Sequence, residues 1–146
     1  MRLLTTVIVA LLLSTPALCG WVTNHATDPL GENYKEFAFV LDSTETVGLT
    51  VICYEDGPNN LSLIWTSTQH WLISEMAVNV RYRIDNGTPE DIMMAVSVDN
   101  TRVTVRDDRM IRRIESGSVM SVKVNGDFYT FDLMGSAFAI ATVDCN

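Results

Sequence analysis

The residues best able to do chemistry are few and scattered in this sequence. His25 and His70 stand far apart, and neither has a histidine, cysteine or carboxylate nearby at the spacing typical of metal ligands. Serines flank His70, but the nucleophile-elbow motif is absent, and the glycines are too dispersed for a phosphate-binding loop. The acidic pairs fall in expected turns or at a helix start, where solvated carboxylates are ordinary. The sequence therefore predicts no catalytic residue, no metal site and no cofactor.

Two of the three cysteines, Cys53 and Cys145, lie beyond the N-terminal segment. In an oxidising compartment a lone pair of cysteines allows one intramolecular bridge. A bridge that closes the long loop between these two cysteines would stabilise the folded chain by at most about 4–5 kcal/mol. The alternative is two free, buried thiols. We predict a Cys53–Cys145 disulfide.

Arginines form two groups in the chain. Arg81 and Arg83 alternate on the polar face of an expected strand that leads to Asp85, and a second group lies within 102–113. Cross-strand pairing with carboxylates explains the first group, and a solvated helix face explains the second. The alternative is a docking patch for an acidic partner or a lipid head group. The candidate binding residues are Arg81, Arg83, Asp85, Arg109, Arg112 and Arg113.

Composition limits the class of protein. The 146 residues are enough for one domain, and 47% of them are hydrophobic, which excludes a disordered chain. Ten Lys and Arg residues stand against eighteen Asp and Glu residues, so the formal net charge is −8. An acidic chain repels a phosphate backbone, so nucleic acid is excluded as a general partner.

Residues 1–19 have the layout of a secretory signal peptide. Arg2 precedes the apolar run 3–13, and small residues stand at Ala17 and Cys19, before the expected cleavage site. The run is shorter than the roughly 20 apolar residues that span a bilayer. Cleavage after Ala17 and lipid attachment at Cys19 are alternatives, although the residues before Cys19 fit a lipoprotein signal poorly. We expect a periplasmic or secreted protein whose single domain is 20–146, with no transmembrane segment after cleavage.

Most of the mature chain has the alternating apolar pattern of short strands. The segment 21–34 has no period and predicts an extended arm, while 66–75 fits no template. Asn125-Gly126 is a strong signal for a tight hairpin. The expected strands are 35–42, 48–54, 61–65, 76–84, 91–98, 101–105, 119–125 and 127–133.

Two helices are expected near the C-terminus. Acidic residues at 107–108 suit a helix start, Met110, Ile111 and Ile114 form one apolar stripe, and Gly117 suits its end. The small apolar segment 135–143 favours a second short helix over a strand. Together these elements predict an all-β fold, an antiparallel sandwich or barrel of about seven or eight strands with one or two short C-terminal helices.

The ordered series of features resembles the TagO/VasI family of type VI secretion-associated periplasmic proteins. The resemblance covers about 21–145 and rests on order and on the cysteine pair, because no one motif is specific. The matching segments are Trp21, Asp28-Pro29-Leu30, Val51-Ile52-Cys53, 61–65, 80–87, 110–116, 119–124, 131–135 and Cys145.

The resemblance implies an exported, non-catalytic accessory or binding domain whose partner is a protein of the cell envelope. The arginine-rich segment 102–113 departs from the family pattern, and a stand-alone, for example phage-encoded, relative fits equally well. The alternative function is a cell-wall-acting enzyme or a periplasmic lysozyme-type inhibitor, because an acidic surface attracts a basic lysozyme.

Overall fold

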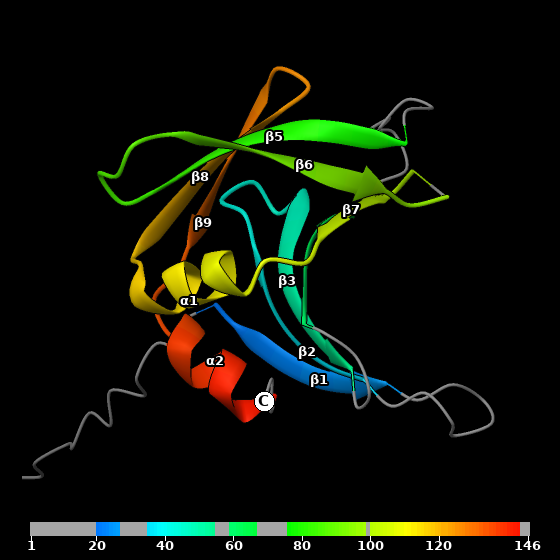
Figure 1. Cartoon of the computed structure of the whole chain (residues 1–146). Helices are drawn as coiled ribbons and strands as arrows, with labels where there is room; N and C mark the ends of the chain where they lie inside the picture. The colour runs from blue at the N-terminus through cyan, green and yellow to red at the C-terminus, as the bar shows by residue number, and fades with distance from the viewer. Residues whose placement is uncertain (1–19, 27–34, 55–58, 67–75, 99, 144–146) are drawn as a thin grey trace, which may run out of the picture.

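The computed structural model describes residues 20–26, 35–54, 59–66, 76–98 and 100–143. Nine strands form one antiparallel sheet in the order β1-β2-β3-β4-β7-β6-β5-β8-β9, and two helices lie beside it (Figure 1). The elements are β1 Val22–Ala26, β2 Lys35–Leu41, β3 Val47–Tyr54, β4 Asn60–Trp65, β5 Ala77–Ile84, β6 Glu90–Val96, β7 Arg102–Val105, α1 Asp108–Ser116, β8 Val119–Val124, β9 Asp127–Asp132 and α2 Ser136–Thr142.

The prediction of an antiparallel, β-rich fold with two short C-terminal helices is confirmed. The count of seven or eight strands is wrong, because part of the expected arm is a strand: β1 pairs with β2 from Val22 opposite Phe39 to Ala26 opposite Lys35. Nothing in the local pattern of β1 alternates, so pairing with β2 decides its conformation rather than its own propensity.

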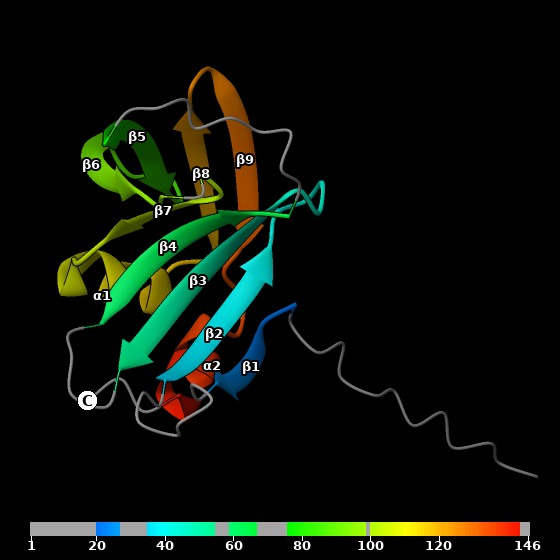
Figure 2. The same ribbon diagram turned by 90° about the vertical axis from the view of Figure 1, so that its right-hand side faces the viewer.

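The sheet bends strongly, so that β5 and β6 run crosswise to the direction of β2 and β3 (Figures 1 and 2). The link between the two halves is β7, which pairs with β4 along Leu61–Ile64 but with β6 only at Ala95 and Val96. A sheet can change direction at such a strand with little loss of free energy, because the strand is short and few of its residues are paired.

The two ends of the sheet approach each other without closing. The Ser43 N–H donates to the Thr130 carbonyl at 3.0 Å, and the Trp21 indole N–H donates to the Asp132 carbonyl at 3.2 Å. These contacts do not form a ladder between β9 and β1, so the barrel, one of the two predicted architectures, is wrong. A sandwich is not confirmed either, since the strands belong to one continuous sheet.

The core lies inside the bend. Strand β5 shows the expected alternation, with Val78, Val80, Tyr82 and Ile84 buried and the residues between them turned outward. Trp65 is buried, and its indole N–H donates to the Tyr129 hydroxyl at 3.2 Å. This contact joins β4 to β9 across the core, so burial of aromatic surface holds the two halves together.

Helix α1 begins and ends as the sequence predicts. The Asp107 carboxylate accepts the Met110 N–H at 3.0 Å as an N-cap, and the stripe Met110, Ile111 and Ile114 is buried. Gly117 follows the helix. A Cβ at that position would lie 2.5 Å from Cγ2 of Ile84, so close packing requires glycine there.

Helix α2 covers one end of the sheet, packing on α1 and on β1 and β2. The Ser136 hydroxyl donates to the Ile114 carbonyl at 2.8 Å, which ties the two helices together. Neither of the two described helices is both long enough and apolar enough to span a bilayer. The leader 1–19 and nearly all of the ambiguous segment 66–75 lie outside the described residues.

Candidate functional site

The exposed side of β5 and β8 gathers positive charge. The register places Arg81 directly opposite Lys123 and Arg83 opposite Ser121. On the far side of β8, Phe128 of β9 lies opposite Lys123. Period-two alternation turns these residues outward while their neighbours fill the core. The basic face, as we name it, consists of Arg81, Arg83, Lys123 and Phe128.

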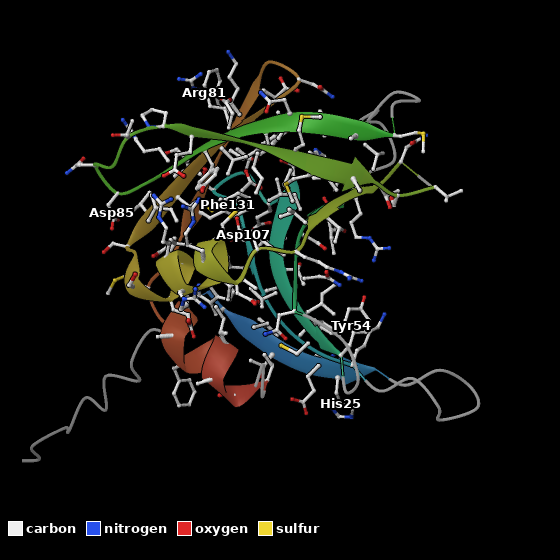
Figure 3. The ribbon with its side chains drawn as sticks, in the orientation of Figure 1. His25, Tyr54, Arg81, Asp85, Asp107 and Phe131 are labelled. Atoms are coloured by element: carbon white, nitrogen blue, oxygen red, sulfur yellow. The ribbon has the colours of Figure 1, made fainter. Side chains whose placement is uncertain are left out.

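Arg81 projects from the outer side of β5, away from the interior where Phe131 lies (Figure 3). Its guanidinium is 3.3 Å from the Asp91 carboxylate of β6, and the Asn79 amide donates to the same carboxylate at 3.1 Å. The Arg81 and Asp91 side chains are 56% and 47% exposed, so water screens the pair. Exposed pairs of this kind contribute about 0.2–1 kcal/mol and exchange partners easily.

Lys123 lies against an exposed aromatic ring. Its ammonium is 5.2 Å from the centroid of the Phe128 ring, within cation–π range. Phe128 is 73% exposed, which is unusual for a phenylalanine on a strand. The pair therefore presents charge and apolar surface together at the edge of the sheet.

The pairing of Arg81 with Lys123 works against stability, because like charges directly opposite each other on neighbouring strands repel. Arg83 adds a third cation two residues along β5, and it forms no ion pair within the described part of the chain. The protein as a whole has a formal charge of −8. A local group of cations on an acidic protein, held by only one exposed ion pair within the described residues, is typical of a surface that can attract an anionic partner.

Asp85, predicted beside the two arginines, serves the backbone instead. It has a positive φ of 51°, and its carboxylate accepts the N–H groups of Ser118 and Val119 at 2.9 and 3.0 Å. Its own N–H donates to the Val119 carbonyl at 2.8 Å. Asp85 thus fixes the start of β8 against the end of β5, and so helps set the register that brings Arg81 opposite Lys123.

The helix arginines do not join the basic face. Arg113 donates to a Glu90 oxygen at 2.5 Å and to the Tyr82 hydroxyl at 3.2 Å, on the opposite side of β5 from Arg81. Arg109 lies 3.7 Å from Glu90. Arg112 is exposed and has no ion pair among the described residues. Arg113 therefore clamps α1 onto the β5–β6 hairpin.

The clamp shifts two pKa values. The hydrogen bond from Arg113, with its charge, holds the pKa of Glu90 below its ordinary value. Burial, together with the charge of Glu90, raises the pKa of Tyr82. At neutral pH Glu90 is ionised and Tyr82 is protonated, so neither group is poised to exchange protons. The arrangement is suited to fastening a helix rather than to acid–base chemistry.

Cys53 lies on β3 and is 5% exposed, whereas Cys145 lies outside the described residues. The disulfide therefore stays a prediction. Among the described residues no three histidine, cysteine or carboxylate side chains are grouped as a metal site would need.

The basic face contains two residues that the sequence reasoning missed, Lys123 and Phe128. A signal was present, because a two-residue turn at Asn125-Gly126 places residues 123 and 128 opposite each other. Their approach to Arg81 had no local signal, since β5 and β8 are separated in the chain by β6, β7 and α1.

Comparison with known proteins gives a fold and no family. No protein-family model matches the chain, and no curated protein matches it. Among solved structures it is similar to invasion associated protein B from Bartonella henselae, with a TM-score of 0.56 and 14% sequence identity over 85% of this chain and 91% of that one. At this identity the similarity shows a shared fold alone, and it contains no evidence for the TagO/VasI family specifically.

Proposed function

We propose that this protein is an exported, non-catalytic accessory domain that binds a protein of the cell envelope through the basic face. One observation carries the proposal: Arg81 and Lys123 lie directly opposite each other on exposed strand surface, with Arg83 and the exposed ring of Phe128 beside them. This arrangement costs stability in the free protein, and a partner that supplies negative charge recovers that cost.

Export is supported by the signal-peptide layout of residues 1–19. The resemblance to the TagO/VasI family supports an accessory role beside a type VI secretion apparatus, with one of its envelope components as the partner. In a stand-alone relative the same face would bind another envelope protein. The basic face argues against a lysozyme inhibitor acting there, because it would repel a basic lysozyme.

Site-specific crosslinking in the envelope of the source organism tests the proposal. A photoreactive amino acid replaces Thr130, whose exposed side chain lies on β9 opposite Ser121. The control position is Arg112, exposed on α1. We expect a discrete adduct with one envelope protein from position 130 and none from position 112.

Two results would contradict this function. Equal adducts from both positions would remove the basic face as the contact surface. Fractionation that finds the mature protein only in the cytoplasm would remove export. An adduct with a secretion-apparatus subunit, identified by mass spectrometry, would favour the type VI role over the stand-alone one.

A further inference from the structure

We infer that the occupant of the basic face is an extended, acidic polypeptide segment whose alternate carboxylates meet the cations of β5 and β8 and whose apolar side chain rests on Phe128. This inference rests on the proposed function and adds the chemistry of the partner.

The spacing of the cations favours an extended ligand. Arg81 and Arg83 lie two residues apart on one strand, which separates their Cα atoms by about 6.8 Å. Lys123 is opposite Arg81, at about 5 Å between Cβ atoms. Side chains two apart on an extended peptide have the same spacing of about 6.8 Å. Two such carboxylates therefore match the two arginines, each of which can hold a carboxylate bidentately.

The existing contacts of the face can be exchanged at little cost. The Arg81–Asp91 pair is exposed and screened, so a carboxylate of the partner can take the place of Asp91. Asp91 would still accept the hydrogen bond from Asn79. Arg83 has no ion pair to break within the described chain. The free protein thus presents cations close to the geometry in which an acidic segment needs them.

Exposed apolar side chains border the cations and favour a polypeptide over a lipid surface. Phe128 is 73% exposed and Met93, opposite Asn79 on β6, is 59% exposed. An aromatic anchor beside charged pairs is the usual composition of a protein-binding surface. An anionic membrane attracts clusters of four to eight Lys or Arg residues, whereas this face has three and the whole chain is acidic.

The test is binding of a fluorescently labelled peptide to the mature protein, followed by anisotropy at low and high salt. The probe alternates glutamate with threonine and ends in tryptophan, and a glutamine version of it is the neutral control. We expect binding of the glutamate probe that weakens as salt is raised, and much weaker binding of the glutamine probe.

Matched variants assign the binding to the face. Arg83→Glu should weaken it at least about tenfold, whereas Arg112→Glu, the same charge change on α1, should leave it nearly unchanged. Phe128→Ala should weaken binding without changing its salt dependence. Asp91→Asn should strengthen it, because Arg81 loses its competing carboxylate. Thermal melting of each variant checks the fold, and Arg83→Gln replaces Arg83→Glu if the latter is unstable.

Several results would overturn the inference. Equal losses in Arg83→Glu and Arg112→Glu would show an effect of net charge alone. Binding to vesicles of anionic phospholipid, lost in Arg83→Glu while the peptide fails to bind, would assign the face to a lipid surface. If the peptide fails while position 130 still crosslinks to a protein, only the acidic-segment chemistry is wrong. If crosslinks arise elsewhere, the proposed function itself fails.

Discussion

At the scale of single residues, Asp42 is a buried carboxylate that accepts several hydrogen bonds from one turn. It is 3% exposed, and it accepts the Thr44 hydroxyl at 2.5 Å and the N–H groups of Thr46 and Val47 at 2.8 and 2.9 Å. Burial by itself raises the pKa of Asp42, but these hydrogen bonds outweigh it and hold the pKa below its ordinary value of 3.8. The carboxylate thus shapes the turn between β2 and β3.

Asp42→Asn should lower the free energy of unfolding by about 1–3 kcal/mol, because an amide cannot accept the same set of bonds as a carboxylate. Because the pKa is lower in the folded state, this stabilisation is present above about pH 4 and is lost as pH falls through the folded pKa. Denaturant titrations between pH 2 and 7 should therefore show a shallower acid dependence in the variant. Asp132→Asn is the control and should change little, because Asp132 is exposed at the end of β9 and an amide oxygen can still accept its side-chain hydrogen bond from the Met134 N–H.

Arg113 is expected to stabilise the folded protein, because it fastens α1 to β5 and β6. Arg113→Met should lower the unfolding temperature, because it leaves Glu90 and the Tyr82 hydroxyl without their shared donor. Arg109→Ala should have a much smaller effect, since Arg109 is 71% exposed and 3.7 Å from Glu90. Thermal melting of both variants checks this. Equal melting temperatures would show that Arg113 does not fasten α1.

At the scale of elements, the junction between α1 and β8 depends on Gly117. Gly117→Ala should destabilise the protein by about 1–3 kcal/mol, because its Cβ would lie 2.5 Å from Ile84 and 3.0 Å from Leu133. Gly48→Ala is the control, because a Cβ there would lie 3.8 Å from its nearest heavy atom, the Ile64 carbonyl oxygen, which is an ordinary van der Waals contact. Equal stability of Gly117→Ala and wild type in denaturant unfolding would disprove the packing argument.

At the scale of the whole molecule, the predicted disulfide would add a covalent link between β3 and the residues that follow α2. The described chain ends at Val143, which is 3% exposed beyond α2, while Cys53 is buried on β3. We predict a Cys53–Cys145 disulfide. Cys53→Ser and Cys145→Ser should destabilise the protein to a similar degree, and the double variant should be no worse than either.

Non-reducing mass spectrometry of the exported protein measures this directly, and we expect one disulfide and no free thiol. Alkylation of both cysteines in native, unreduced protein would refute the bridge. Reduction should lower the unfolding midpoint of the wild type and leave the double variant unchanged.

Local patterns in the sequence were sufficient to predict most of the strands and both helices. Period two identified β5 and turned Arg81 and Arg83 outward, because adjacent residues of a strand must face opposite sides. The capping aspartate, the apolar stripe and Gly117 bounded α1, and Asn125-Gly126 predicted the β8–β9 hairpin, whose turn residues both have positive φ. Each of these signals acts over a few residues, so a single sequence contains it.

Tertiary structure alone decided which strands that are distant in the chain become neighbours. Strand β1 exists because β2 pairs with it, the sheet bends where β7 meets β6 over two residue pairs, and the barrel stays open. The same long-range pairing set Lys123 opposite Arg81. It placed Asp85 in backbone contacts and Arg113 in contacts between α1 and β5–β6, so neither belongs to the basic face. These outcomes depend on burying one core among distant segments, and no local period encodes that.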